Sequence, residues 1–468
     1  MAANGGAESS DLPAELVRRW RSAGAEVTLA QDRLAAAGDN SPALAVLRDA
    51  LAGAQQQLSI VEDELRAVQP RFWATINPQA PVRTLAEVAA ALPAGTVLLH
   101  YLVGRTDLLI WAVTRDGVVA ADHRTGRNRL TALAGRFVDA CAGGGNDPVA
   151  AAELSRLLLA PVRDALAAAE AVFVVPSGPL LRLPMAVLPW NDKPLGRAFP
   201  LTVPPSASAL GTEPAPLASG PALVVGDPAD MAYLPEGADT PVRPGALPGA
   251  AVEAACVATF LPGATTLIGP AAGESAVRAA LPGARVVHLA THGVLDEIAP
   301  LGSAVLLADG ASLTAAEVLG LGLGAEIVVV SACRTGTGRV ARGDEVLGFG
   351  RAVLAAGARA VLVSLWKVND MSAALLTTAF HRRRAGGESS AAALQHACDE
   401  MRTMTLAQAE EAWAGMRAIA AAAGDARLAG LVDREVGDLH QARDLSPAPF
   451  PPYGHPFHWA PFVLIAAS

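Results

Sequence analysis

The sequence has little of what defines several common protein classes. Only four of its 468 residues are cysteines, and they lie far apart with no CxxC pair. This excludes a disulfide framework or a zinc ribbon and is typical of a reducing compartment. The first residues, MAANGGAESSDLPAEL, lack the basic and apolar regions of a secretory signal. No apolar stretch has the length of about 18 residues and the character of a transmembrane helix. We therefore expect a cytoplasmic protein that does not contact a membrane.

Charge is sparse and weighted towards the acidic side. Charged residues make up 17% of the chain, and the formal net charge is −9. The short basic cluster Arg382–Arg384 is typical of a solvated helix face, so we expect no nucleic-acid partner. Hydrophobic residues, in contrast, make up 52% of the chain, which is ample for a large core. The length predicts two or three domains.

The first 75 residues are predicted to form a helical hairpin. Between residues 44 and 68 leucine, valine and alanine recur at alternating spacings of three and four, which is a narrow apolar stripe. The stripe either packs on its own partner helix or forms a docking surface for a regulatory protein. No 34-residue helical repeat is present.

Apolar strands alternate with helices through the rest of the chain. TVLLHYL (Thr96–Leu102) and DLLIWAVT (Asp107–Thr114) predict a β-hairpin, and Thr314-Ala-Ala-Glu317 predicts a capping box that opens a helix. A Pro- and Gly-rich segment between residues 229 and 249 divides this part into residues 83–228 and residues 240–468. Strands that are apolar on both faces, with helices between them, predict a mostly parallel sheet covered by helices on each side. The predicted fold class is therefore α/β, preceded by the helical hairpin.

Two of these strands end in residues that can do chemistry. VVHLATHG places His292 just past the end of one strand, and VVVSACRTG places Cys333 at the end of another, so we expect both side chains in the loops above the strands. Ligands bind beyond the carboxyl ends of parallel strands, and neighbouring strands are about 5 Å apart. Cys333 can supply a nucleophilic thiolate and His292 a proton carrier. The backbone amides of Gly293 and Cys333 are candidates for an oxyanion hole. A free cysteine or a lone histidine at a strand end is also common in an inert core.

Two histidine pairs invite an interpretation as metal ligands, and both are rejected. His288 and His292 have the HxxxH spacing, but in a strand four residues span about 13 Å, too far for one ion. His455 and His458 are interrupted by Pro456. We expect neither a metal nor a cofactor.

Several short motifs follow one another between about Thr96 and Ala467. ATHG, SACRTGTG, GRAVLAAGARAVLVSLWKVND and HPFHWAPFVL together resemble the CHAT family of caspase-like and separase-like cysteine peptidases. The resemblance implies a His/Cys dyad on a caspase-type sheet, at His292 and Cys333, and a protein substrate. Some relatives act in bacterial defence by cutting a partner protein, so a role in a defence or signalling pathway is expected.

The chain departs from the family pattern in two places. Relatives usually carry Gly-Glu-Gly after the cysteine loop, whereas this chain has Gly343, Asp344 and Glu345. Many relatives carry long helical repeat arrays, whereas here only a hairpin precedes the peptidase region. The loop Arg334–Glu345 is interpreted as a mobile cover of the site.

Three residues are candidates for substrate binding. Asp370 follows another strand end and, with Asp344 as the second choice, is expected to select a basic side chain. Asp370 has the alternative role of a helix N-cap. Trp366 either walls the pocket or closes the core. Two other functions stay open for the whole chain: a catalytically silent scaffold or regulator of the same fold, and an α/β module that binds a small molecule.

Overall fold

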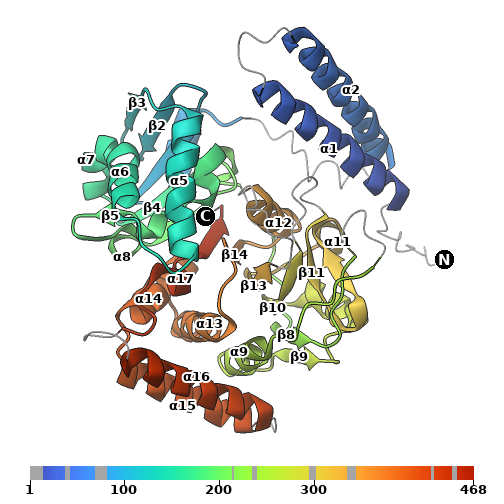
Figure 1. The fold of residues 1–468 in the computed structure, drawn as a ribbon, viewed down its shortest axis with the longest axis vertical. Coiled ribbons are helices and arrows are strands. Elements are labelled where there is room, and N and C mark those ends of the chain that lie inside the picture. The colour runs from blue at the N-terminus through green and yellow to red at the C-terminus, as the bar shows by residue number, and fades with distance from the viewer. Residues whose placement is uncertain are drawn as a thin grey trace, which may run out of the picture.

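The computed structural model describes residues 14–36, 43–68, 82–212, 215–234, 240–294, 302–334, 344–422, 426–444 and 451–467. Figure 1 shows a mixed α/β architecture with an N-terminal pair of helices. The described residues form a five-stranded sheet, an eight-stranded sheet and a separate two-stranded ribbon. The predicted fold class is confirmed. Among the described residues, no helix combines the length and the apolar character needed to cross a membrane.

The N-terminal helices form the predicted hairpin. Helix α1 (Ala14–Ala36) and helix α2 (Leu44–Val68) lie side by side. Arg19 donates two hydrogen bonds of 2.6 and 2.9 Å to the Glu64 carboxylate across the pair. Trp20 of α1 packs against the core of the larger sheet, so the hairpin braces that part of the molecule.

The smaller sheet has the strand order β3-β2-β1-β4-β7. Strands β1 and β2 form the predicted antiparallel hairpin, and β1 pairs with β4 in parallel. Helix α4 covers one face and helices α5 and α6 cover the other. The elements are β1 (Thr96–Val103), β2 (Leu108–Val113), β3 (Val118–His123), β4 (Ala171–Val175), β5 (Pro189–Trp190), β6 (Lys193–Pro194), β7 (Leu201–Thr202), α4 (Leu85–Ala91), α5 (Arg127–Ala142), α6 (Pro148–Leu158), α7 (Arg163–Ala167) and α8 (Leu195–Ala198).

The larger sheet has the order β12-β11-β10-β13-β14-β15, with β8 and β9 continuing from β10. Strands β9, β8, β10, β13 and β14 are parallel, as predicted, whereas β11, β12 and β15 are antiparallel additions at the edges. The bounds are β8 (Leu223–Pro228), β9 (Thr265–Gly269), β10 (Val286–Val294), β11 (Ala304–Leu306), β12 (Ser312–Thr314), β13 (Ile327–Arg334), β14 (Ala360–Ser364) and β15 (Phe462–Ala466).

Helices cover both faces of the larger sheet. Helices α9 and α13 pack on one face, and α10, α11 and α12 pack on the other. The predicted capping box opens α11, because the Thr314 hydroxyl accepts from the Glu317 amide while the Glu317 carboxylate accepts from the Thr314 amide. The bounds are α9 (Pro248–Ala258), α10 (Glu274–Ala280), α11 (Ala315–Leu321), α12 (Asp344–Ala355), α13 (Asp370–Ala385), α14 (Ser390–Thr403), α15 (Leu406–Ala422), α16 (Ala426–Asp444) and α17 (Pro456–Trp459).

A short bridge joins the two sheets. Val203, just after β7, pairs in parallel with Ile465 of β15. The Val203 amide donates to the Leu464 carbonyl over 2.8 Å, and the Val203 carbonyl accepts from the Ala466 amide over 3.3 Å. The larger sheet begins with β8, before the predicted boundary at residue 228, because β8 pairs with β9 and β10.

Candidate active site

The strand register brings His292 and Cys333 together. Strands β10 and β13 are parallel neighbours, and His292 is paired directly with Cys333 in the ladder. Both residues lie inside their strands, because β10 ends at Val294 and β13 ends at Arg334. The expectation that they lie in the loops beyond the strands was therefore wrong. Neighbouring strands lie about 5 Å apart, so the two positions are adjacent at the carboxyl end of the sheet.

Both positions belong to the face covered by α9 and α13. Ala290 is paired with Ser331, two residues before the dyad on each strand, and alternate strand residues share a face. The Ser331 hydroxyl donates to the Glu253 carboxylate of α9 over 3.1 Å, which identifies that face. The register therefore places positions 292 and 333 on one side of the sheet. The side chain of Cys333 lies outside what the structure describes.

The His292 ring is held by a backbone carbonyl. Its Nε2 atom lies 2.8 Å from the carbonyl oxygen of Gly245. Because a carbonyl can only accept, Nε2 carries the proton and Nδ1 is the basic nitrogen of the neutral ring. Nδ1 is buried and makes no hydrogen bond to the described residues. The ring thus presents an acceptor for which a neighbouring thiol is a suitable donor.

Asp227 fixes the segment that carries Gly245. Its Oδ1 atom accepts a hydrogen bond of 2.7 Å from the Leu247 amide. Asp227 is the last residue but one of β8, the neighbour of β10, and has a positive φ of 43°, a conformation that Asp tolerates better than most residues. A carboxylate at the end of the next strand therefore positions the carbonyl that orients His292.

The environment of His292 favours the neutral ring. Burial lowers the pKa of His292 from its ordinary value of 6.5, because only 6% of the residue is exposed to solvent. The Gly245 carbonyl and the Asp370 carboxylate act in the opposite direction, and Lys367 acts with burial. The imidazole is therefore in its basic form near neutral pH.

This balance predicts the titration of His292. We expect a midpoint below 6.5, and we expect Asp370→Asn to lower it further, because the substitution removes a carboxylate that stabilises the imidazolium. The midpoint is measured from the ring resonances of ¹³C-labelled histidine as a function of pH, with His292→Gln used for assignment. A midpoint at or above 6.5, or an upward shift in Asp370→Asn, would contradict this account.

Asp370 is the first residue of α13 and does not cap the helix. The N-cap is Asn369, whose side-chain oxygen accepts from the amides of Met371 and Ser372, each over 3.0 Å. The interpretation of Asp370 as an N-cap was therefore wrong. Burial, followed by the nearby Glu253 carboxyl, raises the pKa of Asp370. Gly249 permits this arrangement, because a Cβ atom there would lie 2.4 Å from the Asp370 Cβ.

A buried polar cluster lies beneath the dyad. We call Glu253, His288, Ser331, Thr377 and His381 the sub-dyad cluster. The Glu253 carboxyl, 1% exposed, accepts from Ser331 and, over 2.9 Å, from Thr377. His288 is fully buried; its Nε2 lies 3.0 Å from Glu253 Oε1 outside hydrogen-bond geometry, and its Nδ1 lies 3.2 Å from His381 Nε2. These contacts tie α9, β10, β13 and α13 together under the site.

Gly293 and Trp366 border a small hollow at the strand ends. The strand-end hollow, about 50 Å³, is lined by Gly293, Ala332, Phe349, Ser364 and Trp366, among other residues. Trp366 also belongs to the main core and donates through Nε1 to the Phe457 carbonyl over 3.3 Å, so it closes the core and walls the hollow.

The two acidic candidates do not line this hollow within the described part of the chain. Asp370 lies near His292, on the face of the sheet opposite the hollow. Asp344 is the first residue of α12, and its side chain lies outside what the structure describes. The expected cover loop lies almost wholly outside them as well.

The other cysteines are unsuited to nucleophilic chemistry. Cys141, Cys256 and Cys398 are free thiols. Burial raises the pKa of Cys141 to about 11 and the pKa values of Cys256 and Cys398 to about 12. A thiol with so high a pKa is almost entirely protonated near neutral pH. Within the described residues, no group of three His, Cys, Asp or Glu side chains could hold a metal ion.

Sequence reasoning missed Gly245, Asp227 and Glu253. Only Asp227 could have been found from the sequence, because the apolar strand PALVVGDP ends in Gly-Asp-Pro and so places a carboxylate at another strand end. Gly245 lies in a Pro- and Gly-rich segment that was interpreted only as a boundary. Glu253 lies in an alanine-rich helix, and its partners are between 35 and 124 positions away.

Comparison with known proteins agrees with this architecture. The family model described as CHAT domain matches residues 149–467. Tetratricopeptide repeat protein 28 of Mus musculus is 31% identical over 212 residues, which are 37% of this chain and 9% of that protein. The protein of the same name from Homo sapiens is 35% identical over 107 residues, 23% of this chain and 4% of that protein. The chain thus spans less than a tenth of the length of these curated relatives. Since the family model covers both the larger sheet and part of the smaller one, the chain belongs to the CHAT domain family.

Proposed function

We propose that the protein is a cysteine endopeptidase that hydrolyses a peptide bond in a protein partner. The observation that carries the proposal is the pairing of His292 with Cys333 at the carboxyl ends of two parallel strands. The His292 ring donates through Nε2, so its Nδ1 is left as an acceptor. Membership of the CHAT domain family supports it. A place in a defence or signalling pathway is part of the proposal on the family resemblance alone.

The proposed mechanism uses the dyad in two steps. Cys333 loses its proton to His292 and attacks the scissile carbonyl, so a sulfur–carbon bond forms. His292 then gives the proton to the leaving amine as the carbon–nitrogen bond breaks. Water, activated by His292, hydrolyses the thioester and restores the thiol. The proposed oxyanion donors are the backbone amides of Gly293 and Cys333, which lie on adjacent strands.

Substrate selection is proposed to involve both faces of the strand ends. The strand-end hollow, walled by Trp366, has the size and the apolar lining for a small side chain of the substrate. Asp370 and Asp344 remain the proposed selectors of a basic residue. The α1 and α2 hairpin is the proposed site for a regulatory protein, because Leu29 of α1 and Val46 and Ile60 of α2 are exposed.

The test is a search for new protein termini. Lysates of the source cells are incubated with the wild-type protein or with Cys333→Ala, and the termini are labelled and identified by mass spectrometry. The proposal expects a small set of cleavages that the wild type produces and the variant does not. If both proteins give the same termini although both bind the same partner proteins in the lysate, the catalytically silent scaffold becomes the better explanation.

A further inference from the structure

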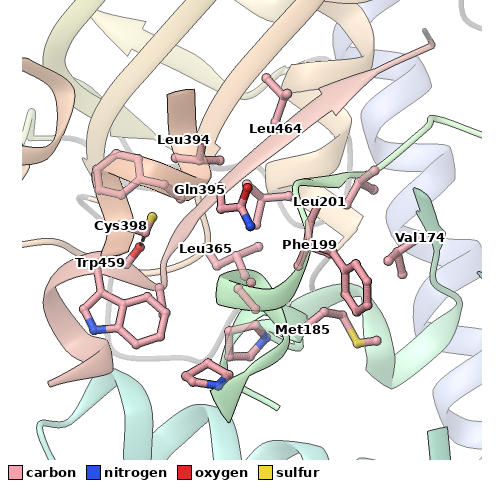
Figure 2. Close-up of a pocket in the computed structure, with 18 of the residues that line it drawn as sticks. Val174, Met185, Phe199, Leu201, Leu365, Leu394, Gln395, Cys398, Trp459 and Leu464 are labelled. Carbon is pink, nitrogen blue, oxygen red and sulfur yellow. Dashed lines mark hydrogen bonds between the residues drawn. The ribbon is translucent and has the colours of Figure 1, made fainter. Parts of the chain in front are cut away.

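A second pocket lies away from the dyad, where the two sheets meet. Figure 2 shows side chains from the smaller-sheet half facing side chains of α14, α17 and β15 across this space. The pocket has a volume of about 70 Å³. Its lining is mainly apolar and includes Val174, Met185, Phe199, Leu394, Trp459 and Leu464. It is formed jointly by the two halves, so neither half contains it alone.

The polar groups inside the pocket are already engaged. The Gln395 amide nitrogen donates to the Arg197 carbonyl over 3.1 Å, and the Cys398 thiol donates to the Trp459 carbonyl over 3.3 Å, as Figure 2 shows for the thiol. These contacts hold the polar atoms against the wall. The interior is therefore suited to an apolar group, whose transfer from water is favourable.

The charged groups of the lining carry a net positive charge. Arg402 Nη2 lies 2.7 Å and Arg197 Nε lies 3.4 Å from the same atom, Asp399 Oδ1. Two guanidinium groups thus share one carboxylate, which leaves one positive charge uncompensated within this group of three. The Arg197 side chain is 48% exposed and marks where the pocket opens to solvent. An anion at this opening would be attracted by the surplus charge.

We propose that this pocket binds a small carboxylate with a short alkyl chain. The chain would occupy the apolar interior, and the carboxylate would lie at the opening beside Arg402 and Arg197, where a guanidinium can donate to it in a bidentate manner. The volume is about half of the roughly 150 Å³ that takes a benzene ring. A single alkyl chain fits that space better than a ring does. The inference does not depend on peptidase activity.

The first experiment compares two probes of equal length and opposite charge. Sodium hexanoate and hexylammonium chloride are titrated into the full-length protein by isothermal titration calorimetry. We expect saturable binding of hexanoate and binding of hexylammonium that is weaker by at least about tenfold, because the surplus guanidinium repels an ammonium group. Absence of hexanoate binding, or equal binding of both probes, would overturn the proposal.

Variants locate the binding site. Arg402→Gln is expected to weaken hexanoate binding by at least about fivefold, since it removes the surplus charge. Leu394→Phe and Ala391→Leu each add three carbon atoms to the lining and so fill the interior; Ala391 is only partly buried, so its variant is the better tolerated of the two. Each should reduce binding at least as much. Arg156→Gln is the matched control, because its side chain is 62% exposed on α6 outside the pocket. Thermal melts identify the variants that fold. Unchanged hexanoate affinity in the folded pocket variants would show that the carboxylate binds elsewhere.

Discussion

Cys333→Ala and His292→Ala are each expected to lower peptide cleavage by at least about a thousandfold. Removing the thiol removes the nucleophile. Removing the imidazole removes the base whose Nε2 is fixed on the Gly245 carbonyl, so no other described group replaces it at this position. The double variant should be no slower than either single variant, because the two residues act as one unit. The rate is measured with a fluorogenic peptide taken from a cleavage site found in the search for termini.

Two control variants separate loss of chemistry from loss of structure. Cys141→Ala removes a buried thiol of α5 in the smaller-sheet half, and His396→Ala removes an exposed histidine of α14 that pairs with Glu388. Both should retain the wild-type rate. Melting temperatures establish that His292→Ala and Cys333→Ala are folded. A folded dyad variant that cleaves at the wild-type rate would place the nucleophile or the base elsewhere.

Glu253→Ala is expected to lower the free energy of unfolding by about 3 kcal/mol. The substitution leaves the half-buried Ser331 hydroxyl and the fully buried His288 Nε2 without the carboxyl group and opens a cavity between α9 and α13. Thr377 is less affected, because its hydroxyl also lies 3.0 Å from the Ala373 carbonyl. The free energy is measured by equilibrium unfolding in urea.

Matched substitutions test whether the carboxyl group itself is responsible. Glu253→Gln keeps the volume and one acceptor oxygen, so it should lose less than half as much as Glu253→Ala. Glu274→Ala removes a glutamate that is 44% exposed and pairs with Arg278 on α10, and it should cost less than about 1 kcal/mol. If Glu253→Ala unfolds at the wild-type urea concentration, the sub-dyad cluster does not stabilise the fold.

The parts of the fold that follow from local patterns were predictable from the sequence. The stripe on residues 44–68, the β1–β2 hairpin and the Thr314–Glu317 capping box depend on residues close together in the chain, and all three were confirmed. The proximity of His292 and Cys333 was also predictable, because parallel strands align their carboxyl ends. The sequence did not reveal that both residues lie inside their strands, since a strand end set by pairing with a partner strand has no local signal.

The rest depends on contacts between distant segments. The Gly245 carbonyl reaches His292 across 47 positions, and the Glu253 carboxyl reaches Thr377 across 124. The Asn369–Asp370 pair gave two equally good capping residues, and only the backbone of α13 distinguishes them. The antiparallel course of β15 was equally invisible, because an apolar strand has the same composition in either direction.

The bridge between Val203 and Ile465 has a practical consequence for anyone dividing this chain. Strand β15 lies between β14 and the residue after β7, so excising the segment before β8 would leave its outer rim without a neighbour. Such a rim, on an apolar strand that starts with a buried phenylalanine, is a template for self-association into aggregates. Truncated chains that begin at residue 215 should therefore precipitate, whereas chains that retain the smaller sheet should stay monodisperse.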